Sequence, residues 1–175
     1  VFHLTQDAEI TMESSLSDMT DEKMDAAIAG GVNRFSFGIQ SFQTDIRNGI
    51  GRPLPRNRVM EQFFRFAKKD ALMILDLIYG LPGETTETMK QDIQDAKACG
   101  AAGLDLYKLQ LLPGSPLTKS FEKAGKKLEV PYLQSLFQAA EEELLQTGAT
   151  NISCTHWKWN ENERSVYNTL ASNGS

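Results

Sequence analysis

The chain has 175 residues, 41% of them hydrophobic, and a formal net charge of −5. This composition is typical of a globular protein, and the length supports one ordinary hydrophobic core rather than two. The acidic balance argues against nucleic acid as a partner, and no apolar stretch approaches the ~18 residues of a membrane-spanning helix. Two cysteines, Cys99 and Cys154, are too few for a disulfide framework and indicate a reducing, cytoplasmic compartment. The chain begins with Val1 and shows no leader, so we expect it to be part of a longer protein.

Short β-like runs alternate with helix-like stretches along the chain. The expected strands cover residues 9–12, 34–40, 73–79, 104–112 and 151–154. The expected helices begin after Thr20, Pro55, Thr85 and Ser115, and a long apolar stripe that ends at Gly148 predicts one more. Strands that alternate with helical crossovers predict βαβ units and a parallel sheet.

The pattern alone does not separate a closed barrel, an open barrel and a doubly wound sheet. One face of the expected strand 34–40 carries Ser36, Gly38 and Gln40, and the other carries only large apolar side chains. The small and polar face favours a barrel, because these side chains would face a crowded or wet interior.

Polar side chains at the ends of expected strands are the candidate site residues. Gln40, Asp76 and Glu13 lie at or near the carboxyl ends of apolar strands, the edge at which parallel α/β folds bind ligands. Arg52 lies in a Gly/Pro-rich loop and could grip a carboxylate with its planar fork. The alternatives are a buried, paired carboxylate for Asp76, a packing role for Gln40 and a solvated loop position for Arg52.

Other motifs carry less information. Gln110 ends another expected strand, and its orientation is open. His3 and His156 lack partners at ligand spacing, so we expect no metal site, and no Walker, Rossmann or nucleophile-elbow motif occurs. The tail carries Trp157 beside His156, which predicts either a pocket for a flat ligand or a small satellite core.

Four segments in order carry a family resemblance. They are Glu9-Ile-Thr-Met-Glu13, Gly31-Val-Asn-Arg-Phe-Ser-Phe-Gly-Ile-Gln-Ser-Phe42, Gly51-Arg52 and Leu75-Asp-Leu-Ile-Tyr-Gly-Leu-Pro-Gly-Glu84. Together they resemble the radical S-adenosylmethionine (SAM) enzymes related to oxygen-independent coproporphyrinogen III oxidase, and the similarity runs from about Glu9 to about Tyr167. The resemblance implies a partial parallel (β/α) barrel, of which residues 1–148 would supply the later strands. Residues 149–175 would begin the C-terminal region that follows.

The resemblance also implies roles for single residues. Arg52 matches the family arginine that binds the carboxylate of SAM, and Gln40 matches a glutamine that contacts its ribose. Glu13 and Asp76 match carboxylates of the same pocket, and Ile78 offers backbone contacts to the adenine. These roles suit a cofactor that carries an ammonium, a sulfonium, a carboxylate and a diol.

The signature loop of that family, Cys-x3-Cys-x2-Cys, is absent from the sequence. Cys99 and Cys154 cannot replace it, because the three ligands of a [4Fe–4S] cluster with an open iron must come from one tight loop. We therefore expect the chain alone to be inactive and the cluster to belong to the full-length protein. The missing barrel strands predict an exposed apolar edge, which would lead either to self-association through it or to partial disorder.

The resemblance leaves two activities open for the full-length protein. Both kinds of enzyme act on a tetrapyrrole and need an electron donor. One is the oxidase proper, which decarboxylates coproporphyrinogen III, and the other is the heme-utilisation branch, which opens the heme ring and releases iron anaerobically. The tail Cys154-Thr-His-Trp-Lys-Trp159 followed by Glu163-Arg-Ser-Val-Tyr-Asn168 resembles the second, as does Ser14-Ser15 in place of Asp-Pro. Gln110, His156 and Trp157 are the candidate substrate contacts. A non-catalytic heme chaperone stays open as a further class.

Overall fold

The computed structural model describes residues 3–166. Its strands are β1 (Thr11–Ser14), β2 (Arg34–Gln40), β3 (Leu72–Tyr79), β4 (Gly103–Lys108), β5 (Thr150–Asn151) and β6 (His156–Lys158). Its helices are α1 (Asp21–Ala29), α2 (Thr44–Gly49), α3 (Arg56–Phe66), α4 (Thr86–Ala98), α5 (Pro116–Lys123) and α6 (Val130–Gln146). Tyr167, Asn168 and the rest of the expected C-terminal region to residue 175 lie outside the described residues.

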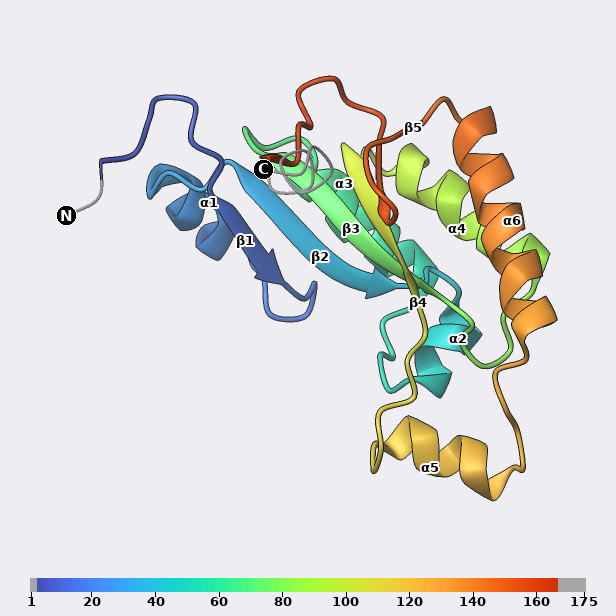
Figure 1. Ribbon diagram of the computed structural model, residues 1–175. Coiled ribbons are helices and arrows are strands. Elements are labelled where there is room, and N and C mark those ends of the chain that lie inside the picture. The colour runs from blue at the N-terminus through green and yellow to red at the C-terminus, as the bar shows by residue number, and fades with distance from the viewer. Residues whose placement is uncertain (1–2, 167–175) are drawn as a thin grey trace.

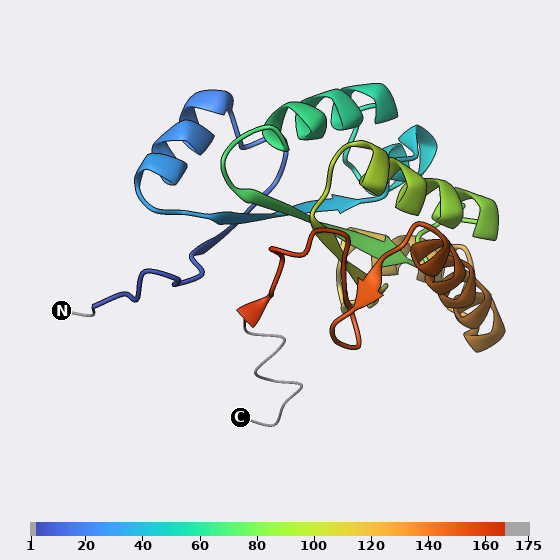
Figure 2. The same cartoon turned by 90° about the horizontal axis from the view of Figure 1, so that it is seen from above.

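The strands form one sheet in the order β1-β2-β3-β4-β6-β5. The first four pair in parallel, β6 runs antiparallel to β4, and β5 runs antiparallel to β6. Helices α1, α3 and α4 cover one face, and α6 packs against α4 (Figure 1, Figure 2). The expected α/β class with a mostly parallel sheet is confirmed, and the sheet is a partial barrel that does not close.

The two faces of the sheet differ as the alternation in β2 predicts. Phe35, Phe37 and Ile39 are buried on the face that the helices cover, and the Phe37 ring lies 5.9 Å from Phe63 and 5.7 Å from Phe66 between centroids. Truncating a phenylalanine in such a core costs about 3–5 kcal/mol. The opposite, open face carries the small and polar side chains, and the chain before β1 and after β6 runs beneath it (Figure 2).

Local sequence signals set several helix ends. The Thr20 side chain accepts from the Lys23 amide at the start of α1, and Thr85 and Thr88 form a reciprocal capping box at the start of α4. Ser115 caps α5, with Pro116 in its first turn. These expected starts are confirmed.

The structure corrects three expected strands and adds one helix. The expected strand 104–112 ends at Lys108, because after the bond from the Leu109 amide to the Tyr79 carbonyl (2.9 Å) the chain leaves the sheet towards α5. The expected strand 151–154 is wrong, because residues 152–155 turn between β5 and β6. The first strand covers Thr11–Ser14 rather than residues 9–12. Helix α2 was not expected, since its six residues show no apolar periodicity.

Two strands form the edges of the sheet: the two-residue strand β5 on one side and β1 on the other. Thr11, Met12 and Glu13 are exposed there, and Met12 is the one large apolar side chain among them. The expected open edge is therefore present but largely polar. Among residues 3–166, no helix combines the length and apolar character needed to cross a membrane.

Candidate functional site

The carboxyl end of β2 brings together two of the predicted site residues. Arg52 reaches back from the loop after α2, and its Nη1 donates to the Gly38 carbonyl oxygen at 2.7 Å. The Gln40 side chain lies over the same glycine, because a Cβ on Gly38 would sit 2.7 Å from Gln40 Nε2. The same Cβ would sit 3.8 Å from Arg52 Nη1. Glycine at position 38 therefore leaves the space that the Gln40 side chain occupies, whereas a Cβ there would make only an ordinary contact with Arg52.

Gln40 has an unusual backbone and an unsatisfied side chain. Its φ of 71° lies in the left-handed region, which residues other than glycine rarely adopt. The β2–β3 register shifts between Gly38 and Gln40, as at a bulge that re-aims a side chain. Its Oε1 is buried and has no hydrogen-bond partner among the described residues. Such an orphan acceptor costs about 1–3 kcal/mol, which a donor on a bound ligand would remove.

A cavity of about 690 Å³ opens beside these residues. This volume lies within the range of small-molecule sites, roughly 300–1,000 Å³. Gly51, with a φ of 74°, makes the turn that directs Arg52 into it. Gly38, Arg47, Arg52 and Gln62 are among the residues that line this space, which we call the Gln40–Arg52 cavity; Gln40 lies next to it and is not itself a lining residue.

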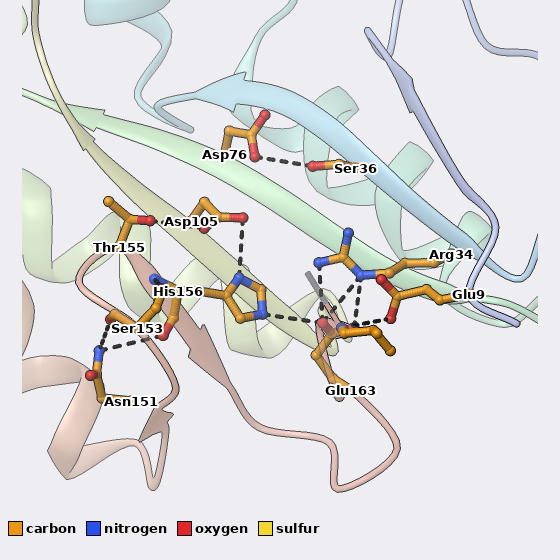
Figure 3. A network of polar contacts seen from close by, with 11 residues as sticks. Glu9, Arg34, Ser36, Asp76, Asp105, Asn151, Ser153, Thr155, His156 and Glu163 are labelled. Atoms are coloured by element: carbon orange, nitrogen blue, oxygen red, sulfur yellow. Dashed lines mark hydrogen bonds and ion pairs between the residues drawn. The ribbon is translucent and has the colours of Figure 1, made fainter. Parts of the chain in front are cut away.

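Asp76 lies next to Gly38 in the register of β3 on β2. It accepts a hydrogen bond from Ser36 Oγ at 3.0 Å (Figure 3). Burial raises the pKa of Asp76 to about 6, and the charges of Asp105 and Glu13 add to that rise. The hydrogen bond from Ser36 opposes it. A carboxyl group that titrates near neutrality in a polar cavity is typical of functional sites.

The remaining predicted cofactor residues lie on the same open face. Glu13 of β1 pairs with Ser36 and lines, with Asp76, a polar cavity of about 370 Å³. Ile78 lies two residues beyond Asp76 at the carboxyl end of β3, opposite Tyr107 of β4. A guanidinium, two carboxylates and an orphan amide oxygen thus lie at three adjacent strands, with Arg52 in the cavity of about 690 Å³ and the carboxylates in the separate cavity of about 370 Å³. Such a set could hold a zwitterion that also carries hydroxyl groups.

His156 lies in a buried network of charges rather than in a cavity (Figure 3). The side chain is 0% exposed, with Nδ1 3.1 Å from Asp105 Oδ2 and Nε2 3.1 Å from Glu163 Oε1. Burial alone would lower the pKa of His156, but the two carboxylates outweigh burial and raise it to about 9. Nε2 forms a hydrogen bond with Glu163, whereas Nδ1 faces the Asp105 carboxylate at ion-pair distance without a hydrogen bond; both carboxylates favour the protonated ring. Arg34 Nε completes the network at 3.1 Å from both oxygens of Glu163.

Trp157 packs in the hydrophobic core. It is 4% exposed and pairs with Leu104, whose side chain belongs to the same cluster on the helix-covered face. The structure therefore does not bring His156 and Trp157 to the cavities at the strand ends. Of the two interpretations of the tail, packing describes the position of Trp157, and substrate contact by either residue stays a prediction.

Gln110 lies just beyond β4, away from the Gln40–Arg52 cavity. It is exposed and lines a separate hollow of about 510 Å³ with Tyr107, Leu112 and Cys154. Its role as a substrate contact also stays a prediction.

Several residues that organise the site were not predicted. Arg34 lies on the same open face of β2 as Ser36 and Gly38, so the alternation in β2 could have identified its orientation. Arg47 and Asp92 are both buried beside the carboxyl end of β2. Nothing in the sequence pattern marks them, because Arg47 bonds to backbone carbonyls and the partners of Asp92, the Phe42 amide and Gln43 Nε2, are brought near only by the fold.

A family model described as the Radical SAM superfamily matches residues 2–96. The chain is 33% identical over 174 residues to anaerobilin synthase of Escherichia coli O157:H7, covering 98% of the chain and 39% of that protein. It is 31% identical over 125 residues to the heme chaperone HemW of Bacillus subtilis, covering 71% and 32%. It is 27% identical over 166 residues to the oxygen-independent coproporphyrinogen III oxidase of Paracoccus denitrificans, covering 89% and 35%. The chain thus spans 32–39% of the length of these relatives.

Solved structures show the same fold. The coproporphyrinogen III oxidase HemN from Escherichia coli matches with a TM-score of 0.79 at 22% identity, over 99% of this chain and 39% of that one. The archaeal Elp3 of Methanocaldococcus infernus matches with a TM-score of 0.64 at 14% identity, over 75% and 32%.

Proposed function

Because the chain belongs to the radical SAM superfamily, we propose that it forms the cofactor-binding side of an enzyme that acts on a tetrapyrrole. We place the enzyme in the heme-utilisation branch, which opens the heme ring and releases iron without oxygen. The observation that carries this choice is the 33% identity to anaerobilin synthase across 98% of the chain. A cytoplasmic location and a low-potential electron donor belong to the same proposal.

The residues at the strand ends fit SAM. Arg52 would bind the carboxylate of the cofactor, and Glu13 and Asp76 would face its cationic groups. A ribose hydroxyl would donate to the orphan Oε1 of Gln40, and the backbone at Ile78 would contact the adenine. Support comes from the unpartnered amide oxygen of Gln40, from the space over Gly38 that the Gln40 side chain occupies, and from the bond of Arg52 to the Gly38 carbonyl.

When it is bound next to a [4Fe–4S] cluster, this cofactor would supply radical chemistry, through reductive cleavage of a carbon–sulfur bond. The chain's own residues bind and orient the cofactor, and the sheet shields the reacting centre from water. The ligands of the cluster are not among these 175 residues. Cys99 is buried at the end of α4 and Cys154 is exposed between β5 and β6. We place the three cluster cysteines in a part of the protein outside this chain.

Two alternatives have specific support. A heme chaperone that binds heme without turning it over is supported by the 31% identity to HemW. An oxidase that decarboxylates coproporphyrinogen III is supported by the 27% identity to the Paracoccus enzyme.

Anaerobic turnover of the full-length protein separates these functions. The protein is reconstituted with iron and sulfide and is given heme, SAM and dithionite. We expect 5′-deoxyadenosine and a ring-opened pigment to appear together. Recovery of unchanged heme with no 5′-deoxyadenosine would favour the chaperone, and carbon dioxide from coproporphyrinogen III would favour the oxidase.

A further inference from the structure

Arg47 of α2 is a buried arginine whose guanidinium binds backbone carbonyls. The residue is 4% exposed. Its Nη1 donates to the Ile39 carbonyl at 2.7 Å and to the Ser41 carbonyl at 3.0 Å. Its Nε donates to the Leu54 carbonyl at 2.8 Å. One side chain therefore ties the end of β2 to the loop that follows Arg52.

These carbonyls surround the two residues that meet over Gly38. Ile39 and Ser41 flank Gln40, whose left-handed backbone needs support from its surroundings. The Arg52 amide donates to the Arg47 carbonyl at 2.9 Å, so the backbone of Arg47 fixes Arg52 from the other side. Gln40 and Arg52 are thus held by the same residue.

Asp92 of α4 holds the next part of the turn from the opposite side. Its Oδ1 accepts from the Phe42 amide at 2.9 Å and from Gln43 Nε2 at 2.7 Å. Arg47 thus anchors the carbonyls of this turn and Asp92 anchors its amide, and their opposite charges stabilise each other. The turn is fixed by charged groups from two separate helices.

Burying an arginine in this space costs free energy, because its charge is removed from water. Burial and the nearby charge of Arg52 both lower the pKa of Arg47, which shows that its charged form is disfavoured there. A methionine would fill a similar volume without desolvating a charge. It could not hold three carbonyls in a fixed arrangement, because only a planar fork of donors does that.

We propose that Arg47 is a positioning residue for the cofactor pocket, because it holds Gln40 and Arg52 in the conformations that bind the ligand. The proposal rests on the proposed function, because it takes the Gln40–Arg52 cavity to be the SAM site. Arg47 also lines this cavity, but its Nη1 and Nε donate to the three backbone carbonyls, so the proposed role is to hold its neighbours rather than to bind the cofactor.

A double-mutant cycle tests the coupling between Arg47 and Gln40. The affinity of the full-length protein for S-adenosylhomocysteine is measured by calorimetry for wild type, Arg47→Met, Gln40→Ala and the double variant. We expect the Arg47→Met variant to bind the analogue at least tenfold more weakly than wild type. The double variant should bind less than threefold more weakly than Gln40→Ala alone. Arg47→Lys, which keeps the charge without the fork, should fall between wild type and Arg47→Met.

Leu136→Ala is the matched control for loss of stability. Leu136 is fully buried in α6, outside the turn that Arg47 holds. It should lower the unfolding temperature without a tenfold loss of affinity, and its effect should add to that of Gln40→Ala. Equal losses for Leu136→Ala and Arg47→Met, or additive effects of Arg47→Met and Gln40→Ala, would overturn the proposal.

A ligand-free measurement keeps the proposal separate from the proposed function. If the wild-type protein does not bind the analogue, the proposed function fails, and the NMR signals of the Gln40 side-chain amide and Arg52 Nε–H decide the positioning role. We expect both signals to shift or broaden in Arg47→Met and to stay in place in Leu136→Ala. Unchanged signals in Arg47→Met would overturn the positioning role.

Discussion

Arg52 is the only cation among the five predicted cofactor residues, so it is the natural partner for a carboxylate. Its Nη1 is anchored on the Gly38 carbonyl, which leaves the rest of the guanidinium for a ligand. We expect Arg52→Ala to weaken SAM binding to the full-length protein by about 1.5–3 kcal/mol, the scale of a charge-assisted contact. Calorimetric titration measures this loss. Arg58→Ala, an exposed arginine of α3, is the control and should bind normally; normal binding by Arg52→Ala would remove that residue from the site.

Asp76 predicts a pH dependence of binding. Its pKa of about 6 means that the carboxylate is mostly ionised at pH 7 and mostly protonated at pH 5. If the ionised form faces the cationic groups of SAM, affinity should be about tenfold lower at pH 5 than at pH 7. The Asp76→Asn variant should bind weakly and show no such change over this range. A wild-type affinity that does not vary between these pH values would contradict the role of Asp76.

At the scale of elements, the Arg34–Glu163–His156–Asp105 network attaches β6 and the chain after it to the parallel part of the sheet. The pKa of His156, about 9 in the folded state, lies above its ordinary value of 6.5. The imidazolium therefore stabilises the fold fully below pH 6.5, and this stabilisation is lost as the pH rises through 9.

Urea unfolding at pH 6 and pH 10 measures this loss. Other groups also titrate in this range, so the comparison is made against His156→Gln. We expect the wild type to lose about 2–3 kcal/mol more than the variant between the two pH values. Parallel losses in the two proteins would show that His156 is not charged in the folded state.

The sequence predicted elements where local signals decide the structure and failed where tertiary contacts decide it. The alternation in β2 and the caps Thr20, Thr85 and Ser115 identified a strand and three helix starts correctly. Helix α2 has no apolar period, and it is held by bonds of the Arg47 side chain to carbonyls outside the helix, seven and eight residues away. The charged network depends on Arg34 and Glu163, which are 129 residues apart, so no local pattern could reveal it.

The candidate site was predictable because of a simple property of parallel sheets. Polar residues at the ends of successive strands share one edge, so Gln40 and Asp76 had to lie close together. The bulge at Gln40 and the support from Arg47 and Asp92 depend on packing and were not predictable. His156 and Trp157 look like ligand contacts in sequence, but the sheet places one in a charge network and the other in the core.

At the scale of the whole molecule, the chain forms an open sheet rather than a closed barrel. Strand β1 has a free edge, and self-association through it stays a prediction. The proposed division of labour is that this chain supplies cofactor contacts and the rest of the protein supplies the iron–sulfur cluster.

That division predicts the outcome of cluster reconstitution. Iron and sulfide added anaerobically to the 175-residue chain should give no stable cubane, because its two cysteines lie in separate elements. Iron analysis and EPR after reduction measure the result, and the full-length protein is the positive control. A stoichiometric, EPR-active cluster on the chain would refute the division.

Hydrogen exchange of the full-length protein, followed by mass spectrometry with and without SAM, tests the location of the cofactor site. The structure predicts slower exchange at residues 38–54 and 76–80, which carry Gln40, Arg52 and the end of β3. The segment 156–163, which lies away from the proposed cofactor site, should show no change. Protection confined to other segments, or none at saturating SAM, would contradict a cofactor site at the carboxyl ends of β2 and β3.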